Sequence, residues 1–270
     1  MADETRQRFL SYGGGVQSSA LIVLAAQGRI APIDAALFCN TGDDSEHPDT
    51  LIFVREVMRP YCEKHGIVLH ELQRLHKGEP QTLYGRMMNH TRESLSEPIP
   101  VYGYSGAPMS RACTVDHKIK VLERWIRRNA VTLPVETLIG ISLDEIERAK
   151  TGQNAYEVRQ YPLLDLGLNR IDCANIIADA GLPVPPKSSC FFCPFHSMLT
   201  WQELRRDRPD LFEKAAGIED KLNSQRANRD KPPVYLTRRK MPIRDAVTAA
   251  GDTLFSDGMA GECDGGFCFV

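Results

Sequence analysis

The stretch Ser11-Tyr-Gly-Gly-Gly-Val-Gln-Ser-Ser19 decides the fold that we expect for this chain. It follows a short apolar segment, residues 8–12, and precedes a helix-forming segment, residues 18–27. Three glycines let the backbone turn sharply and come close to a ligand, because they carry no Cβ. The amino terminus of the following helix offers unpaired N–H groups and a positive dipole end. The loop therefore predicts an anion site that is best matched to phosphate groups.

Strands and helices alternate outward from this loop. Compact apolar runs predict strands, and apolar residues at helical spacing predict helices. The expected strands are residues 8–12, 33–39, 67–72 and 136–141, and the expected helices are residues 18–27, 48–65 and 115–129. Because strands that are separated by helices form parallel sheets with both faces covered, this pattern predicts an α/β fold.

The composition is that of a globular protein. The 270 residues are 42% hydrophobic and 25% charged, with a formal net charge of -2. No apolar run approaches the roughly 18 residues that a membrane span needs, and the charged amino terminus has no apolar signal core. We expect a cytoplasmic protein without a membrane partner, with an α/β domain at residues 1–185 and a smaller, mainly helical region at residues 186–270. The Gly- and Pro-rich residues 74–112 are expected to form a lid or a binding loop.

The glycine loop has a family resemblance. Its spacing is neither that of the G-x-G-x-x-G loop nor that of the G-x-x-x-x-G-K-[ST] loop. It resembles the PP-loop of the ATP pyrophosphatase superfamily, S-G-G-x-D-S, and is similar to the S-[FY]-G-G-G-x-Q-S variant of the phosphoadenosine phosphosulfate (PAPS) reductase-like branch, although Gln17 stands where many members have Asp. The resemblance implies a Rossmann-like fold of the adenine nucleotide alpha hydrolase type that binds ATP or a related adenine nucleotide. The implied binding residues in this loop are Ser11, Gly13, Gly14, Gly15, Gln17, Ser18 and Ser19.

Two further segments resemble the same branch, so that the similarity covers about residues 8–195. Residues 39–50 resemble its D-T-G-x-x-x-P-E-T region, and residues 140–148 resemble its G-x-x-x-[DE]-[ES]-x-x-R element. The resemblance implies that Arg148 lies near the anionic group of the substrate; the alternative is a surface ion pair with Asp144, four residues earlier. The acidic residues of the first segment are also suited to the first turn of a helix. The implied nucleotide-binding residues are Asn40, Thr41, Gly42, Asp43 and Gly140.

Three of the eight cysteines form a candidate metal site. Cys190 and Cys193 form a C-x-x-C motif, and Cys113 precedes an expected helix. Thiolates hold iron–sulfur clusters, and a C-x-x-C motif supplies two of them from one turn. The resemblance extends to PP-loop thiolation and DNA phosphorothioation enzymes, which implies that these three residues ligate a [4Fe–4S] cluster. The alternatives are a thiol redox pair or a zinc site. The candidates for a fourth zinc ligand are His117, His196, Cys263 and Cys268.

The carboxyl-terminal tail carries a further candidate catalytic residue. Glu262-Cys263 is similar to the E-C-G-x-x motif of cluster-free PAPS reductases, although Asp264 replaces the Gly; the alternatives are a metal ligand or a frayed terminus. Lys and Arg side chains stabilise charge that develops in a transition state. The expected catalytic residues are therefore Cys263, Arg148 and Lys118. Cys39, Cys62 and Cys173 lie in apolar segments and are expected in the core.

Residues 205–240 contain three basic clusters that suit a nucleic-acid backbone. Trp201 and Tyr235 flank these clusters, and residues 245–270 carry acids but no Lys or Arg. A DNA or RNA substrate is one interpretation, and a solvated helix surface with acidic partners such as Asp207 and Asp210 is the other.

Together these features predict an enzyme that adenylates an acceptor oxygen with release of pyrophosphate, after which sulfur from the cluster displaces AMP. Magnesium would offset the phosphate charge, and the sulfur donor is not specified by the sequence. The first alternative is a sulfonucleotide reductase that uses a tail thiol. The second is a non-enzymatic nucleotide- or zinc-binding interaction protein. A homodimer is compatible with each of these three interpretations.

Overall fold

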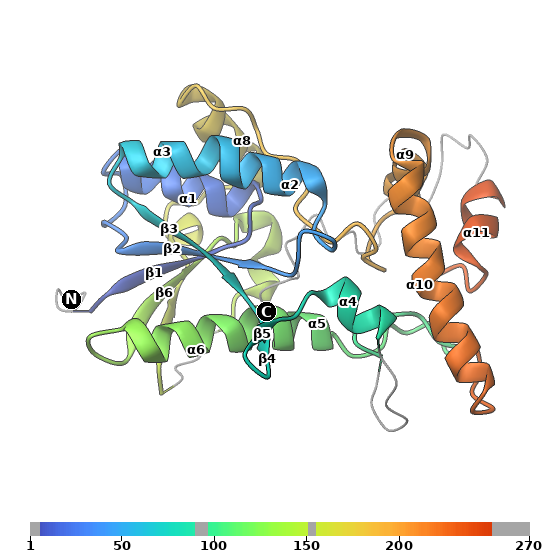
Figure 1. The fold of residues 1–270 in the computed structure, drawn as a ribbon. Helices are drawn as coiled ribbons and strands as arrows, with labels where there is room; N and C mark the ends of the chain where they lie inside the picture. Colours follow the sequence, from blue (N-terminus) through green and yellow to red (C-terminus); the bar gives the residue numbers. More distant parts are fainter. Residues whose placement is uncertain (1–5, 90–96, 151–154, 250–270) are drawn as a thin grey trace.

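A five-stranded parallel sheet forms the centre of the computed structural model, which describes residues 6–89, 97–150 and 155–249. The strand order is β3-β2-β1-β6-β7, so that the glycine loop follows the central strand (Figure 1). The strands are β1 (Arg8–Tyr12), β2 (Ala35–Asn40), β3 (Val68–Gln73), β6 (Val135–Ile139) and β7 (Glu157–Gln160). A separate antiparallel pair consists of β4 (Leu75–His76) and β5 (Glu79–Pro80).

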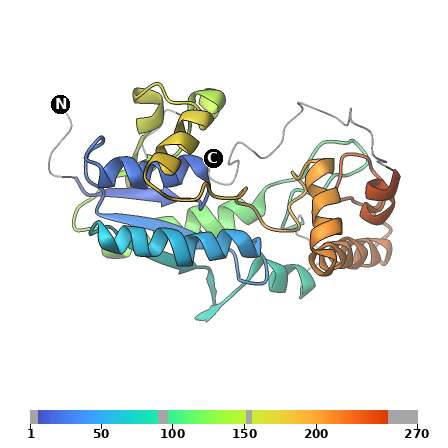
Figure 2. The same cartoon turned by 90° about the horizontal axis from the view of Figure 1, so that it is seen from above.

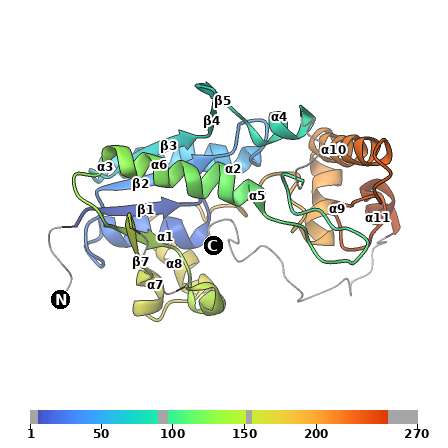
Figure 3. The same cartoon turned by 90° about the horizontal axis from the view of Figure 1, so that it is seen from below.

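Helices cover both faces of the sheet, which confirms the predicted Rossmann-like α/β fold class. Successive strand residues point to opposite faces: Phe38 belongs to one core cluster and its neighbour Leu37 to another. The first face packs against α1 (Val16–Ala26), α8 (Arg170–Asp179) and the consecutive helical segments α2 (Pro48–Ile52), η1 (Phe53–Met58) and α3 (Arg59–Lys64). The second face packs against α6 (Lys120–Asn129) (Figures 1 and 3).

The expected elements agree with the observed ones apart from their ends. The helix predicted at residues 48–65 is the α2–η1–α3 segment. The helix predicted at residues 115–129 is η2 (Val115–Ile119) followed by α6, with α5 (Ala112–Thr114) before it. Strand β7 was not predicted, because charged Glu157 and Arg159 occupy the positions of one face and leave no apolar run.

The carboxyl-terminal helices form a second core beyond the carboxyl ends of the strands (Figures 1 and 2). They are α9 (Met198–Asp207), α10 (Pro209–Ala227) and α11 (Ile243–Ala249). The connection at residues 74–112 contributes to this core through α4 (Leu83–Met88) and through Ile99 and Val101. Tyr102 and Tyr235 exchange backbone hydrogen bonds of 2.8 and 2.9 Å. Parts of this connection, among them α4, Ile99 and Val101, are therefore packed into the fold.

Two short helical segments follow strands β6 and β7. They are the kinked 3-10 segment η3 (Leu143–Arg148) after β6 and α7 (Pro162–Asp165) after β7. None of the helices in the described ranges is long and apolar enough to cross a membrane.

Glu219 of α10 joins the carboxyl-terminal segments, and this yields a stability prediction. Its buried carboxylate accepts the backbone N–H groups of Leu236 (2.7 Å) and Ile243 (2.8 Å). The substitution Glu219→Ala leaves both donors buried without an acceptor, which costs about 1–3 kcal/mol for each unsatisfied group. We expect a fall in the free energy of unfolding of at least about 2 kcal/mol by urea denaturation. Exposed Lys214→Ala, on the same helix, is the control and should change it by less than about 0.5 kcal/mol.

Candidate functional site

The glycine loop forms the turn between β1 and α1. Gly14 has a φ of +75°, and a Cβ there would lie 3.1 Å from the Thr50 side chain, so a larger residue is excluded by strain and by contact. The Ser18 hydroxyl accepts the Gly13 N–H and donates to the Gly15 carbonyl, each at 3.2 Å. The first turn of α1 contains no acidic residue. The helix N–H groups and dipole therefore face the loop without a carboxylate to oppose an anion.

Gly140 brings the segment after β6 directly against this loop. A Cβ at Gly140 would lie 2.8 Å from the Ser18 nitrogen and 3.1 Å from the Gln17 carbonyl carbon, both of which are backbone atoms. Glycine is therefore required by close backbone approach rather than by a positive φ. The contact joins two of the three segments that were predicted to bind a nucleotide.

Gln17 connects the glycine loop with the predicted catalytic Arg148. Its amide nitrogen lies 3.5 Å from the Ser142 hydroxyl and 3.4 Å from the Glu145 carboxylate, to which it donates. Glu145 in turn forms an ion pair with Arg148, and both side chains are buried. Burial raises the pKa of the Glu145 carboxyl, and the Arg148 charge opposes that rise. A neutral amide at position 17 avoids a second carboxylate beside Glu145.

The ion-pair partner of Arg148 differs from the sequence-based alternative, which was a surface pair with Asp144. Asp144 instead accepts the backbone N–H of Arg170 at 2.6 Å. The difference arises because residues 143–148 form a 3-10 segment with a non-helical Glu145. In that geometry residue 145, not residue 144, faces Arg148.

The loop after β2 is held by charged neighbours. The Asn40 side chain donates to Asp43 and to Glu71 at 2.8 Å each, and its oxygen accepts the Gly42 N–H at 2.7 Å. Arg55 forms two hydrogen bonds to Asp43, of 2.8 and 2.7 Å, and these lower the pKa of that carboxyl. The predicted binding residues Asn40 and Asp43 thus fix the shape of the loop, with Arg55 as a partner that the sequence did not indicate.

A segment that we call the cysteine strap, residues 188–191, lies across the carboxyl edge of β1 and β2. The Ser188 hydroxyl donates to the Gly13 carbonyl of the glycine loop. The His47 N–H donates to the Ser189 carbonyl at 3.0 Å, and the Phe191 N–H donates to the Ser45 carbonyl at 3.1 Å. The strap therefore brings the C-x-x-C motif to the loops of the predicted nucleotide site.

A buried polar chain continues from Cys190 into the protein. The Cys190 sulfur lies 3.3 Å from the Thr41 hydroxyl, which also lies 2.9 Å from the Glu46 carboxylate and donates to it. The Lys118 ammonium is 3.9 Å from the same carboxylate oxygen. Glu46 is 1% exposed and Lys118 is 5% exposed. The predicted catalytic Lys118 therefore belongs to this edge of the sheet but lies beneath the surface. Glu46 was missed as a site residue, because the sequence indicates only an acidic helix turn.

The predicted cluster ligands are only partly brought together. Cys190 and Cys193 lie on one turn, with the Cys193 N–H 3.1 Å from the Cys190 carbonyl, and Cys113 and Cys190 border the same carboxyl-terminal core. Their three thiols are chemically suited to an iron–sulfur cluster. Within the described ranges, however, no three His, Cys, Asp or Glu side chains are grouped to hold a metal ion. The cluster therefore stays a prediction.

Three further cysteines and the two histidines considered as zinc ligands are buried. Cys39, Cys62 and Cys173 are buried, as expected, and burial raises the pKa of each thiol to about 12. Burial, with nearby cationic groups, lowers the pKa of His117 and of His196 to about 3, so both imidazoles are neutral. The predicted catalytic Cys263, and Cys268, lie outside the described residues.

The basic segment divides into two kinds of contact. Arg206 and Arg208 pair with Asp207 and Asp210, as the solvated-surface interpretation predicts. Arg238 and Lys240 lie instead over the rings of Tyr102 and Tyr104, at 5.9 Å from each centroid, and Tyr104 is 87% exposed. Trp201, expected to flank the basic clusters, is fully buried in the carboxyl-terminal core.

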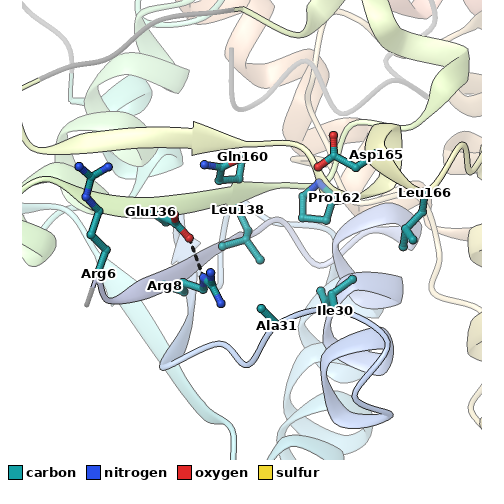
Figure 4. A pocket seen from close by; sticks show the side chains of 10 residues that line it. All are labelled: Arg6, Arg8, Ile30, Ala31, Glu136, Leu138, Gln160, Pro162, Asp165 and Leu166. Atoms are coloured by element: carbon teal, nitrogen blue, oxygen red, sulfur yellow. Dashed lines mark hydrogen bonds and ion pairs between the residues drawn. The ribbon is translucent and has the colours of Figure 1, made fainter. Parts of the chain in front are cut away.

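Two cavities within the described residues are lined by different segments. One, of about 300 Å³, adjoins the cysteine strap and is lined in part by His47, Lys187, Ser189 and His196. The other, of about 630 Å³, lies over β1, β6 and β7, where the 2.6 Å Arg8–Glu136 ion pair forms one wall (Figure 4). The larger cavity contains none of the predicted site residues.

Comparison with known proteins gives limited information. No family profile matches the chain, and no curated protein sequence matches it. Among solved structures, the chain is similar to the U34-tRNA thiolase NcsA from Methanococcus maripaludis with its [4Fe-4S] cluster, with a TM-score of 0.42 and 14% identity, over 80% of this chain and 71% of that one. We therefore derive the function from the residues of the site itself.

The Gln17–Glu145 contact yields a pH-dependent prediction. The isosteric substitution Gln17→Glu places a second carboxylate beside Glu145 in a buried position. We expect a fall of about 2 kcal/mol in the free energy of unfolding at about pH 8. Because the pKa of a buried carboxyl in the folded state is raised, protonation relieves this loss as the pH falls from about 8 towards 5.

Urea denaturation at both pH values is the measurement. The exposed substitution Gln27→Glu is the control and should change the free energy of unfolding by no more than about 0.5 kcal/mol at either pH. A loss in Gln17→Glu that grows as the pH falls would contradict the assignment.

Proposed function

We propose that this protein is a PP-loop enzyme that binds ATP or a related adenine nucleotide and uses it in sulfur transfer. The observation that carries the proposal is the cysteine strap. Ser188 bonds to Gly13 of the glycine loop, and Cys190 forms a backbone bridge with Glu46 of the loop after β2. A phosphate-binding loop and a C-x-x-C motif are thereby joined at one edge of a parallel sheet, where such sheets bind ligands.

The nucleotide phosphates are proposed to lie on the glycine loop. Its N–H groups and the α1 amino terminus supply donors in a fixed arrangement, so charge that develops on the phosphates is stabilised without reorganisation. Gln17 is held by Ser142 and Glu145 and carries no charge, so it is not a metal ligand in this proposal. Magnesium, where required, would be bound mainly through phosphate oxygens.

The proposed reaction has two steps. An acceptor oxygen attacks the α-phosphorus of ATP, so that pyrophosphate leaves and the acceptor carries AMP; a sulfur nucleophile then displaces AMP. Adenylation replaces a poor leaving group with a good one. The chain's own residues contribute position: the strap holds Cys190 beside Thr41, and Lys118 with Glu46 supports that position from beneath. Arg148, paired with Glu145 beside Gln17, is proposed to face the substrate anion.

Cys113, Cys190 and Cys193 are proposed to hold a [4Fe–4S] cluster. When bound, a cluster with three protein ligands supplies an iron that can carry sulfur. The thiols fit this cofactor in kind and number, and Phe191 and Phe192 provide an apolar environment because both are buried.

A nucleic acid is the acceptor that the surface favours. The exposed Tyr104 ring with Lys240, and Arg238 over Tyr102, combine aromatic faces with positive charge, which is the chemistry that binds exposed bases and phosphates. Tyr102 and Tyr104 belong to the connection that leads to Cys113, whereas Arg238 and Lys240 lie between α10 and α11. DNA and RNA are both compatible with these contacts.

The close approach at Gly140 provides the test of nucleotide binding. Gly140→Ala forces a methyl group against the Ser18 backbone and displaces the loop. We expect the affinity for ATP, measured by isothermal titration calorimetry, to fall by at least about tenfold, or 1.4 kcal/mol. Gly217→Ala is the matched control, because a Cβ there meets nothing within 4 Å and lies in α10. Wild-type protein that binds no adenine nucleotide would contradict the proposal.

Anaerobic purification tests the cofactor. We expect the wild-type protein to show the broad visible absorption of an iron–sulfur cluster, with about four iron and four sulfide ions per chain. Cys190→Ser should lose most of the iron, whereas Cys62→Ser, at a buried core position, should retain it. A protein with zinc and no iron would instead support the structural-metal alternative.

A further inference from the structure

The cysteine strap is hydrogen-bonded to both nucleotide loops at once. Ser188 bonds to the carbonyl of Gly13, whose own N–H is held by Ser18. On the other side, the backbones of Ser189 and Phe191 pair with those of His47 and Ser45. A movement of the glycine loop therefore changes the position of Ser188, two residues from Cys190.

The Cys190 thiol is in turn held by a buried network. Thr41 contacts its sulfur at 3.3 Å and bonds to Glu46, which is paired with Lys118. A network of buried charges has few alternative arrangements, because each one leaves a charge without its partner. Cys190 therefore has a defined position that depends on the loops at both ends of the strap.

We propose that the cysteine strap couples adenine-nucleotide binding to the reactivity of the Cys190 thiol, with Ser188 and Thr41 as positioning residues. This rests on the nucleotide site of the proposed function. A nucleotide phosphate on the glycine loop orders the peptide units to which Ser188 is bonded, and so restricts the strap. Because coupling between binding sites is reciprocal, a group bound at Cys190 also changes the nucleotide affinity.

The consequence for the proposed reaction is an order of events. Nucleotide binding comes first and positions Cys190, so that sulfur chemistry at the group that Cys190 would hold is matched to an occupied loop. The smaller cavity beside the strap, lined by Ser189 and His196, leaves space on its other side. The strap can therefore shift, when no nucleotide is bound to the glycine loop, without disrupting the packing of a core.

The test measures thiol alkylation on the full-length, reduced chain. A short pulse of iodoacetamide is applied with and without saturating ATP and Mg²⁺, and mass spectrometry of peptides gives the rate at each cysteine. We expect ATP to change the Cys190 rate by at least about fivefold. Cys62, buried in the core that α3 forms with the sheet, is the internal reference and should not respond. Calorimetry on the same samples gives the ATP affinity.

Variants separate coupling from simple covering of the thiol by ATP. Ser188→Ala removes the hydrogen bond to Gly13. In this variant the Cys190 alkylation rates with and without ATP should differ by less than about twofold. Ser224→Ala, an exposed serine on α10, is the matched control and should keep the wild-type ratio. Thr41→Val, which removes the hydroxyl at the Cys190 sulfur, is the second variant and should also lower the ratio. Thermal unfolding checks that each variant is folded.

The outcomes distinguish the two proposals. If ATP does not bind, the proposed function fails and the coupling fails with it. If ATP binds but the Cys190 rate is unchanged in the wild type, the coupling alone is overturned. The ratio of the Cys190 alkylation rates with and without ATP could also stay at its wild-type value in both Ser188→Ala and Thr41→Val. That result would show that ATP covers the thiol directly, which also overturns the role of the strap.

Discussion

The backbone contact between Gly140 and the first turn of α1 is the constraint on which the site depends. At 2.8 Å from the Ser18 nitrogen there is no space for a Cβ, so the segment after β6 and the glycine loop after β1 form one surface. Parallel pairing of β1 with β6 places both segments at the same edge of the sheet. Because the contact is between main-chain atoms, its geometry is fixed by the sheet register and does not depend on a flexible side chain.

Electrostatic interactions explain why Gln17, Glu145 and Arg148 occupy the positions around this contact. Arg148 and Glu145 are buried as a pair, which is favourable only when the remaining polar atoms near them also find partners. Gln17 supplies a neutral donor to that carboxylate. An aspartate at position 17, the residue common in the PP-loop motif that this loop resembles, would bring two carboxylates together in a place with little solvent. The departure from the common motif is therefore matched by its neighbours in space.

The cysteine strap shows how a distant segment completes the site. Residues 188–191 lie between α8 and α9, more than 140 residues after the loop at Ser45. Their backbone pairs with that loop as a strand would. This pairing places Cys190 against Thr41 and Glu46, and it brings the carboxyl-terminal core next to the sheet edge.

The sequence predicted the part of the site that depends on local chemistry. The glycine loop, four of the five strands of the parallel sheet and the segments at residues 39–50 and 140–148 were all identified, because turns, helix starts and apolar periods leave local patterns. It did not predict β7, whose charged positions hide an edge strand. It also did not identify Glu46, Glu145 or Ser188 as site residues, because each acts through a partner that is distant along the chain or sits in an irregular turn.

By itself, then, the sequence determined a parallel α/β sheet with a glycine loop after its first strand, because backbone conformation and burial follow from residue type at short range. Only the tertiary structure decided which side chains meet there. It paired Arg148 with Glu145 rather than with Asp144, and it placed Cys190 beside Thr41 at the edge of the sheet. These contacts follow from strand register and the path of the strap, which bring together residues that no local pattern relates.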